Sequence, residues 1–454
     1  MINKKLMIFL VNVSLITLTI NFMPFDITES SEAANSGENL TYRQEVLWNK
    51  TYGEKNNEEA SAVLQTTDGG YILVGRTDGL GVDYRGIVVK TDINGLEQWT
   101  KNYLGFIRAL IQTPDGGYAF VGEKWSFDFF YFSKNDMWLI KTDSNGAVEW
   151  NQSYGGNFNE AAYGLIQSAD GGYILAGYTD SYGAGEKDMW LIKTDANGTL
   201  QWDQSYGGNM NEEAFGLIQT VDGGYALAGY TESYGNGKKD VWLIKTDVNG
   251  TIQWNQTYGG TENEEVYTLV QTVDGDFLLA GYTESYGVGE EDIWLVKTDQ
   301  SGARHWDKTF GSYWSDKAQA LIQTTDGNFA LAGSIYWDPR CEHPCHFNMF
   351  LAKIDITGNE QWNQSYGGVN GDKAYGLLQT SDENFLLAGY TESYGAGGWD
   401  MWLVKTIKRR YEETTTTTSW DTAEIGIFPS LIASVILIKL YKRRKQTKRI
   451  VGYH

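Results

Sequence analysis

The chain has 454 residues, of which 58 are acidic and 36 basic, so its formal net charge is −22. A surface this acidic repels nucleic acid, and we therefore exclude DNA and RNA as partners. Four histidines and two cysteines leave little material for a histidine-based catalytic triad or a three-histidine metal site.

The N-terminal segment has the outline of a secretory signal. Residues 1–5 are short and basic, residues 6–20 are apolar, and small residues follow at Ala33 and Ala34. This order is typical of a cleaved signal peptide. We predict a signal peptide over residues 1–34, with an uncleaved membrane anchor as the alternative.

A tryptophan-centred motif then recurs seven times. Each copy resembles Trp150-Asn-Gln-Ser-Tyr154-Gly-Gly, and successive tryptophans are 51 to 56 residues apart. Regular self-similarity at this period is the signature of a repeat architecture. The seven tryptophans are Trp48, Trp99, Trp150, Trp202, Trp254, Trp306 and Trp362.

One repeat contains four short β-prone segments. In the third repeat they are separated by Asp170-Gly-Gly, a polar loop over residues 180–187, and Asn197-Gly. Asp-Gly and Asn-Gly favour tight hairpin turns. Nearly continuous apolar runs indicate sheets that are covered on both faces, which is typical of β-propeller blades. Small pairs such as Ala176-Gly177 are expected at inner positions of a tapering blade.

The two ends of the repeat region are complementary. The first repeat begins with only its tryptophan strand, residues 45–53, and the last repeat ends at Thr406 without one. The N-terminal strand would therefore complete the last blade and leave few open sheet edges. We predict an all-β, seven-bladed β-propeller of four-stranded blades over residues 45–406.

The turn before each tryptophan carries a family resemblance. The run Asp195-Ala-Asn-Gly-Thr-Leu-Gln-Trp202 resembles the Asp-x-x-Gly-x-x-x-Trp docking motif of PQQ-like (quinoprotein alcohol dehydrogenase-like) propeller repeats. The fuller repeat is similar to those of uncharacterised archaeal and bacterial surface proteins. The resemblance implies a fold and not an activity, because propellers host many functions. No quinone-binding residues can be matched, so we expect no cofactor.

One face of the propeller is expected to carry the loops between second and third strands and the joints between blades. Acidic residues and Ser-Tyr-Gly tips recur there, and they would form either a ligand face or a solvated surface with packed tyrosines. The aspartates that begin third strands recur in five blades, which favours a structural hydrogen bond. The three sets are Glu160, Glu212, Glu213, Glu264, Glu265, Asp316 and Asp372; Tyr182, Tyr234, Tyr286 and Tyr394; and Asp136, Asp188, Asp240, Asp292 and Asp400.

The second blade departs most from the consensus. Its second-to-third-strand loop, residues 124–133, is longer and more aromatic than its siblings, and the joint before it, residues 102–106, is shorter. A shortened wall beside aromatic side chains favours a binding recess, and a hydrophobic plug is the alternative. The candidate ligand-binding residues are Tyr103, Phe106, Trp125, Phe127, Phe129, Phe130 and Tyr131.

The sixth blade carries both cysteines in the equivalent loop. Cys341 and Cys345 are separated by three residues that include Pro344, and outside the cell we expect them to form a disulfide. Zinc binding by Cys341, His343, Cys345 and His346 is the weaker alternative, since this spacing is tight for one tetrahedral ion. We predict no other metal site and no catalytic residues.

The C-terminal region has the features of a membrane anchor. Residues 407–423 form a Thr-rich stalk, residues 425–441 are apolar enough for a short transmembrane helix, and the basic tail 442–454 is expected in the cytoplasm. Sequons on the other side of the membrane would then be glycosylation candidates. They are Asn39, Asn49, Asn151, Asn255 and Asn363, with Asn197 and Asn249 in hairpin turns.

Together these features predict a single-pass cell-membrane protein with an extracellular propeller. We expect it to be a non-catalytic binding or adhesion module for a protein or glycan. A carbohydrate-active or other enzyme that uses the loop face, and a structural component of a surface coat, are the alternatives.

Overall fold

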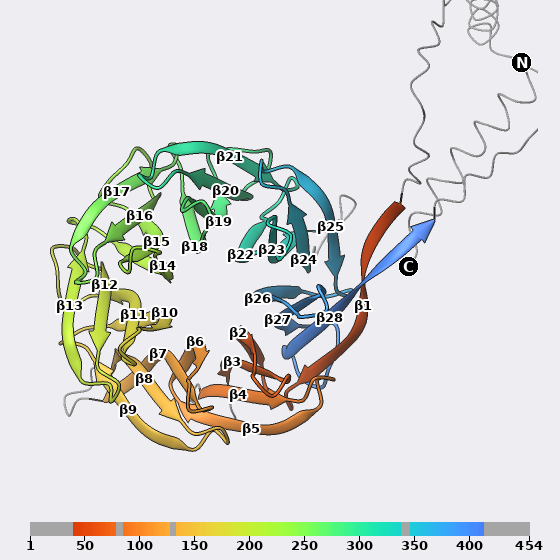
Figure 1. The fold of residues 1–454 in the computed structure, drawn as a ribbon, viewed down its shortest axis with the longest axis horizontal. Helices are drawn as coiled ribbons and strands as arrows, with labels where there is room; N and C mark the ends of the chain where they lie inside the picture. Colours follow the sequence, from red (N-terminus) through yellow and green to blue (C-terminus); the bar gives the residue numbers. More distant parts are fainter. Residues whose placement is uncertain (1–39, 79–84, 128–132, 337–345, 413–454) are drawn as a thin grey trace, which may run out of the picture. The chain divides into compact units, whose positions relative to one another are not determined.

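The computed structural model describes residues 40–78, 85–127, 133–336 and 346–412. Residues Tyr42–Arg410 form one compact unit. Its strands make seven antiparallel sheets of four, arranged around a single axis (Figure 1). The predicted all-β, seven-bladed propeller is therefore confirmed.

Each blade runs from an innermost strand beside the axis to an outermost strand at the rim. From inside outward, blades one to four are β2 (Glu58–Gln65), β3 (Tyr71–Thr77), β4 (Arg85–Thr91) and β5 (Glu97–Leu104); β6 (Phe106–Gln112), β7 (Tyr118–Phe127), β8 (Ser133–Thr142) and β9 (Val148–Tyr154); β10 (Glu160–Gln167), β11 (Tyr173–Thr179), β12 (Asp188–Thr194) and β13 (Leu200–Tyr206); and β14 (Glu212–Gln219), β15 (Tyr225–Thr231), β16 (Asp240–Thr246) and β17 (Ile252–Tyr258). Blades five to seven are β18 (Glu264–Gln271), β19 (Phe277–Thr283), β20 (Asp292–Thr298) and β21 (Arg304–Phe310); β22 (Lys317–Gln323), β23 (Phe329–Tyr336), β24 (Phe347–Ile354) and β25 (Glu360–Tyr366); and β26 (Asp372–Gln379), β27 (Phe385–Thr391), β28 (Asp400–Glu412) and β1 (Leu40–Tyr52).

Blade seven contains both ends of the propeller chain. The N-terminal strand β1 pairs with β28 and forms the outer edge of the sheet. The Tyr366 hydroxyl of blade six donates to the Gln44 carbonyl of β1 at 3.1 Å, and the Trp402 indole donates to Asn49 Oδ1 at 3.3 Å. The predicted closure by the N-terminal strand is thus confirmed.

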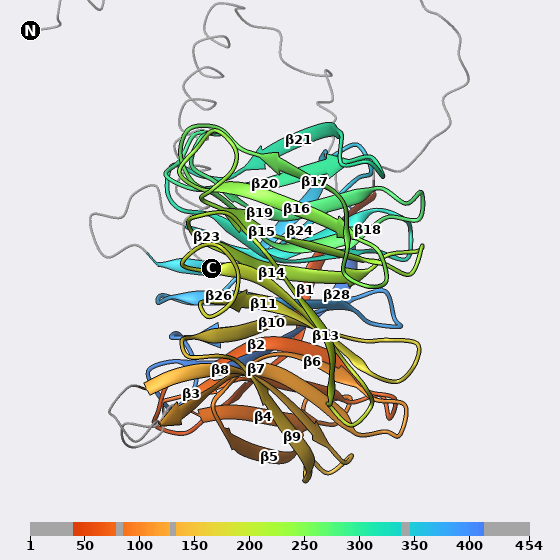
Figure 2. The same ribbon diagram turned by 90° about the vertical axis from the view of Figure 1, so that its left-hand side faces the viewer.

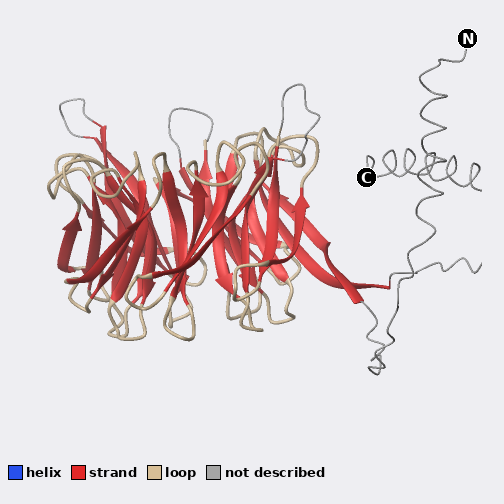
Figure 3. Ribbon diagram, turned by 90° about the horizontal axis from the view of Figure 1, so that it is seen from above, coloured by secondary structure: helices blue, strands red, loops and turns tan. Residues whose placement is uncertain are grey.

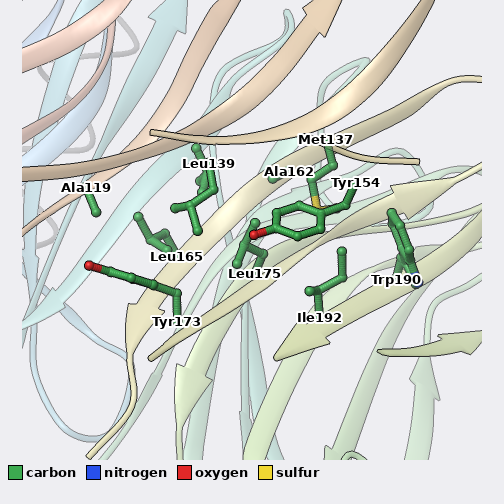
Figure 4. Packing of buried hydrophobic residues seen from close by; sticks show 11 residues of the cluster. Ala119, Met137, Leu139, Tyr154, Ala162, Leu165, Tyr173, Leu175, Trp190 and Ile192 are labelled. Atoms are coloured by element: carbon green, nitrogen blue, oxygen red, sulfur yellow. The ribbon is translucent and has the colours of Figure 1, made fainter. Parts of the chain in front are cut away.

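The hydrophobic core lies between the blades. In one cluster Ala119 and Leu139 of blade two pack against Leu165, Leu175 and other side chains of blade three (Figure 4). The second and third strands of the consensus blades are buried along their whole length, whereas outermost strands such as β13 are mostly exposed. Side views place the loops at the two ends of these strands (Figures 2 and 3). Each blade therefore depends on its neighbours for burial.

The repeated tryptophan joins each blade to the following one. A Cβ on Gly198, in the last hairpin of blade three, would lie 2.9 Å from the Gln152 side chain and against the Trp150 ring of blade two. Tyr154 of the same strand donates its hydroxyl proton to the Gly198 carbonyl at 2.5 Å. This contact explains why tryptophan, tyrosine and the turn glycine recur together.

The small second-strand pair lies opposite a β-bulge. The register of β10 against β11 shifts between Ala162 and Gly164, with Gly177 and Ala176 as their partners. A Cβ on Gly177 would overlap the Ala161 carbonyl oxygen of the bulged strand. Glycine is required because the two backbones approach too closely for a side chain.

The Asp-Gly-Gly hairpins at the other end of the blades hold a buried lysine. Lys245 Nζ lies 2.8 Å from Asp222 Oδ2 and also donates to the Thr246 carbonyl at 2.8 Å. Although partial burial opposes it, hydrogen bonds from Lys245 and Thr220 lower the pKa of Asp222 to about 2. Asp222 is therefore ionised at any pH above about 4.

No helix among the described residues is long and apolar enough to cross a membrane. The predicted signal peptide (1–34), transmembrane segment (425–441) and basic tail (442–454) lie outside the described residues, as does most of the predicted stalk (407–423).

Candidate binding site

The loop face is the end of the propeller where each innermost strand begins and where second and third strands are joined. The acidic residues predicted there are not solvated: Glu160, Glu212 and Glu264 have exposed fractions of 0%. Asp316 and Asp372 are equally buried. Neither the acidic ligand face nor the solvated surface expected from the sequence is therefore correct for these residues. They are internal parts of the joints between blades.

The aspartates that begin third strands organise the loop before them. Asp240 Oδ2 accepts hydrogen bonds from the Asn236 and Gly237 backbone N–H groups at 3.0 and 2.7 Å. Asp188, Asp292 and Asp400 accept equivalent bonds. The predicted structural hydrogen bond is confirmed at these four positions. Asp136 differs, because its Oδ1 lies 3.2 Å from Lys134 Nζ.

The tyrosine tips of the loops are half-exposed and also serve the joints. Tyr234 donates its hydroxyl proton to the Gly207 carbonyl at 2.9 Å, and its ring centroid lies 5.3 Å from that of Trp242. Tyr182, Tyr286 and Tyr394 repeat the same hydroxyl contact. These tyrosines pack on neighbouring elements, as the second of the two sequence interpretations expected.

The side chains that line the axis come from the bulge of each innermost strand. The bulge residues of blades three, four and five are Tyr163, Phe215 and Tyr267, whose ring centroids are separated by 5.0 Å and 5.4 Å. Blade two has Arg108 at this position. Its guanidinium carbon lies 5.2 Å from the Tyr163 ring centroid, so the arginine continues the row of rings.

Ion pairs between neighbouring blades surround this row. Lys187 Nζ lies 2.7 Å from Glu213 Oε1, and Lys239 Nζ lies 2.7 Å from Glu265 Oε1. Lys317 pairs with Glu291 at the same distance. Each of these lysines also lies about 4 Å above a tyrosine ring of its surroundings. The acidic residues Glu213 and Glu265 are thus charge-compensated and are not displayed to a ligand.

Blade seven interrupts the pattern with Lys373. Its ammonium lies 4.1 Å from the Phe347 ring centroid, and no carboxylate among the described residues pairs with it. Burial, and then the charge of Lys317, lowers the pKa of Lys373 below its usual value. An aromatic ring has replaced the carboxylate that other joints provide.

The joint between blades one and two has a different construction from all the others. Arg85 and Gly105 occupy the positions where the other joints have acidic residues or, at one joint, an asparagine. Next to them, the Phe106 and Trp125 rings meet edge to face with centroids 5.7 Å apart. Two of the predicted site residues are therefore brought together.

Two arginines flank this aromatic pair. The guanidinium carbons of Arg76 and Arg108 lie 6.0 Å and 5.7 Å from the Phe106 ring centroid. Arg108 donates two hydrogen bonds to Glu123, at 3.1 and 2.7 Å, and Arg76 donates two to Glu59 Oε2. The arginine side chains are 39% and 35% exposed. We name Arg76, Phe106, Arg108 and Trp125 the arginine–aromatic cluster.

The other predicted site residues are placed less favourably. Tyr103 is buried, and its hydroxyl donates to the Gly146 carbonyl at 2.7 Å. It repeats the blade-joining tyrosine described above, so its position is structural. The backbone of Phe127 lies at the end of β7, and Phe129, Phe130 and Tyr131 lie outside the described residues. Arg76 and Arg108 were missed, although comparing the repeats shows arginine where blade three has Tyr178 and Tyr163.

Most of the cysteine–histidine loop lies outside the described residues. Cys341, His343 and Cys345 belong to this part, and His346 is half-buried just before β24. The disulfide and the zinc alternative therefore stay predictions. Within the described ranges, no group of three or more histidine, cysteine or acidic side chains is placed to hold a metal ion.

The predicted glycosylation sites lie mainly on outermost strands. Asn151 Oδ1 and Asn255 Oδ1 each accept a hydrogen bond from a buried tryptophan indole at 3.1 Å. Asn49 has the same role in blade seven and also lines a polar hollow of about 410 Å³ between β25 and β1. Asn363 is exposed, and Asn39 lies outside the described residues. Indole binding explains why these asparagines recur, whether or not they carry glycans.

No known protein-family profile matches the chain. The chain is 28% identical over 208 residues to the regulatory protein FlaEY of Caulobacter vibrioides, a stretch that covers 41% of this chain and 22% of that protein. The match therefore spans about a fifth of the relative's length.

Similar solved structures have low sequence identity. Sqt1 from Chaetomium thermophilum is 11% identical with a TM-score of 0.47, covering 81% of this chain and 100% of that one. A protein of unknown function from Dyadobacter fermentans has the same identity and TM-score, covering 81% and 99%. A chain in the structure of Drosophila Plexin A in complex with Semaphorin 1b is 9% identical with a TM-score of 0.44, covering 80% of this chain and 87% of that one.

Proposed function

We propose that this chain is a non-catalytic binding module that recognises a glycan at the arginine–aromatic cluster on the loop face. One observation carries the proposal: the single joint with no acidic residue at the start of its third or innermost strand gathers Phe106 and Trp125 between two partly exposed arginines. Aromatic rings pack against the C–H faces of sugars, and arginine–carboxylate pairs offer hydrogen bonds to hydroxyl groups. Such a mixture of rings and oriented polar groups is typical of ligand sites.

The proposal also includes the cellular location of the module. The signal-like segment 1–34, the Thr-rich stalk 407–423, the apolar segment 425–441 and the basic tail 442–454 support a single-pass membrane protein with the propeller outside the cell. We also assign the repeats to the PQQ-like propeller group on the Asp195-to-Trp202 motif. The assignment concerns ancestry and brings no quinone site with it.

Glycan binding by the full chain is testable on a glycan array with a pair of matched double variants. Phe106→Ala with Trp125→Ala is expected to weaken binding at least tenfold, equivalent to about 1.4 kcal/mol. The control is Tyr313→Ala with Trp314→Ala, an edge-to-face pair on the loop face at the joint of blades five and six. The control should retain binding within about twofold, because a pair outside the site should change the binding free energy by less than RT.

Equal losses in the two double variants would contradict the proposed location. An array on which the full chain retains no glycan would reject the glycan itself.

The neighbouring loop gives a further prediction. Changing Phe129, Phe130 and Tyr131 together to serine is expected to abolish binding and leave the melting temperature nearly unchanged, because ligand-platform rings are partly exposed. Buried aromatic residues would instead cost about 3–5 kcal/mol each on truncation. Thermal unfolding and array binding of the same preparation separate these two outcomes.

A further inference from the structure

Two buried carboxyl groups from neighbouring blades face the same glycine at four of the seven joints. One begins the third strand of a blade, and the other begins the innermost strand of the next blade. A glycine separates them: a Cβ on Gly53 would lie 2.5 Å from Glu58 Oε2 and 2.8 Å from Asp400 Oδ1. The joint pairs are Asp188 with Glu212, Asp240 with Glu264, Asp292 with Asp316, and Asp400 with Glu58. At a fifth joint Asp136 has the corresponding place beside Glu160, but it is 15% exposed and lies 3.2 Å from Lys134 Nζ, so we do not count it as a joint pair.

The hydrogen bonds of one joint pair leave one oxygen without a donor. Glu212 Oε1 accepts from Thr231 Oγ1 at 2.8 Å and from the Ser233 N–H at 3.1 Å, and Oε2 accepts from the Gly208 N–H at 2.8 Å. Asp188 Oδ2 accepts from the Gly185 N–H at 3.0 Å. Asp188 Oδ1 is buried and has no partner, although it faces the same glycine as Glu212 Oε2.

The joint between blades seven and one also has a buried carboxylate oxygen without a hydrogen-bond donor. Glu58 Oε1 accepts from Thr77 Oγ1 at 2.9 Å, but Glu58 Oε2 is buried without a donor beside Asp400. Two ionised carboxylates this close in a dry site repel each other strongly. An unsatisfied buried oxygen adds a further cost. A single proton placed between the two groups removes both penalties.

We infer that each joint pair is a proton-binding site, in which one carboxyl group stays protonated at neutral pH and donates its hydrogen bond to the carboxylate of the neighbouring blade. The surroundings favour a proton over a metal ion, because the remaining contacts are N–H and O–H donors and not further oxygen ligands. Four such sites would form a series of carboxyl–carboxylate hydrogen bonds across the blade joints.

The chain supports this inference with two internal comparisons. At the joint of blades six and seven, Asn348 replaces the aspartate, and a Cβ on Gly367 would lie 2.5 Å from both Asn348 Oδ1 and Asp372 Oδ2. An amide has an N–H donor as well as an oxygen, so exchange of its two ends by rotation would present to Asp372 the donor that a protonated carboxyl supplies. At the joint of blades one and two, Arg85 and Gly105 replace both members together. At neither of these joints does a buried carboxyl group face a second one among the described residues.

Other charges near the Asp188–Glu212 pair are engaged elsewhere. Lys187 pairs with Glu213, Glu232 accepts from Asn211, and Asp180 lies after β11 beside Asn159. Glu186 precedes β12, and the tyrosine tips Tyr182 and Tyr234 donate to the backbone. Among the described residues, no lysine or arginine pairs with either member of the joint.

The predicted pH dependence follows from the direction of the shift. Burial raises the pKa of Asp188, the charge of Glu212 adds to this, and backbone hydrogen bonds from Gly185 and Ala184 oppose it. Burial likewise raises the pKa of Glu58, Glu160, Asp240 and Asp316. The folded state then holds protons that the unfolded chain releases above about pH 4. Stability contributed by the joint pairs is present at low pH and is lost as the pH rises through the folded-state pKa values.

The test measures unfolding of the full chain by urea between pH 5 and pH 9. This range lies above the titration of the hairpin aspartates, whose pKa values are lowered. Each retained proton changes the unfolding equilibrium constant by up to tenfold per pH unit. We expect the free energy of unfolding of the wild type to fall with rising pH. The double variant Asp188→Asn with Asp240→Asn retains up to two fewer protons when folded, so its free energy of unfolding should depend less on pH.

Two further variants make the result specific. Asp203→Asn with Asp307→Asn changes the same charge at indole-binding positions where other blades have asparagine, and it should keep the wild-type slope. Asn348→Asp should create a fifth joint pair and steepen the slope. Parallel pH curves for the wild type, the joint variant and Asn348→Asp would overturn the inference. A tightly bound divalent cation whose removal by chelator lowers the melting temperature would also overturn it, in favour of a metal site.

Discussion

Deleting residues 45–53 is expected to lower the free energy of unfolding by about 6–10 kcal/mol. The deletion removes most of β1, and with it the Trp48 and Tyr52 side chains that pack against blade one. Truncating a buried aromatic residue costs about 3–5 kcal/mol, so two of them approach the whole stability of an ordinary domain. Urea denaturation followed by tryptophan fluorescence measures the change, provided that the variant folds at all.

The matched control removes an equal length of chain just before this strand. Deleting residues 35–43 leaves Gln44, Asn49 and Tyr52 in place, so the blade-seven contacts to Tyr366 and Trp402 persist. We expect a loss several times smaller than that of the first deletion. Equal melting temperatures for the two truncations would show that β1 does not hold the ring closed.

Gly229→Ala is expected to destabilise the propeller by more than about 3 kcal/mol. The new Cβ would overlap the Glu213 carbonyl oxygen across the bulge, and a backbone atom can move aside only by distorting the innermost strand. Overpacking usually costs about 1–3 kcal/mol when flexible side chains absorb it. The larger value follows because no flexible group is available here. Chemical denaturation of the variant and the wild type gives the difference.

Gly223→Ala separates a lack of space from a conformational requirement. Gly223 has a φ of 85°, and a Cβ there would meet nothing within 4 Å. Only the left-handed backbone conformation opposes alanine, which costs about 1–2 kcal/mol. A Gly229→Ala loss no greater than that of Gly223→Ala would mean that the bulge adapts to a side chain.

The repeat made the fold predictable, because every blade carries the same turn signals and the same tryptophan. The incomplete first and last repeats also predicted the closure by β1. The Asp-x-x-Gly-x-x-x-Trp spacing corresponds to a contact between neighbouring blades, seen where Trp150 packs on Gly198.

Predictions of side-chain exposure from the sequence were wrong where a neighbouring blade covers the residue. Glu212 begins a strand next to a polar loop, which favours solvent exposure, but Asp188 of the preceding blade and its own backbone partners enclose it. Tyr103 belongs to an unusually short joint, yet it keeps the structural contact of its siblings. Arg76 and Arg108 were accessible only by comparing equivalent positions across blades, because an isolated arginine in a strand carries no signal of its own.

The closing strand pair also fixes how the propeller responds to mechanical load. Thr406 of β28 donates to Gln44 of β1, Arg409 pairs with Glu45, and Trp402 donates to Asn49, so the two strands run antiparallel. The two ends of the propeller chain consequently leave from the same end of one blade (Figure 1). A force that separates these ends breaks the contacts between β1 and β28 one at a time, which needs less force than sliding the strands past each other. When only one of the two ends is held, no force acts between them and the strand pair is not opened in this way.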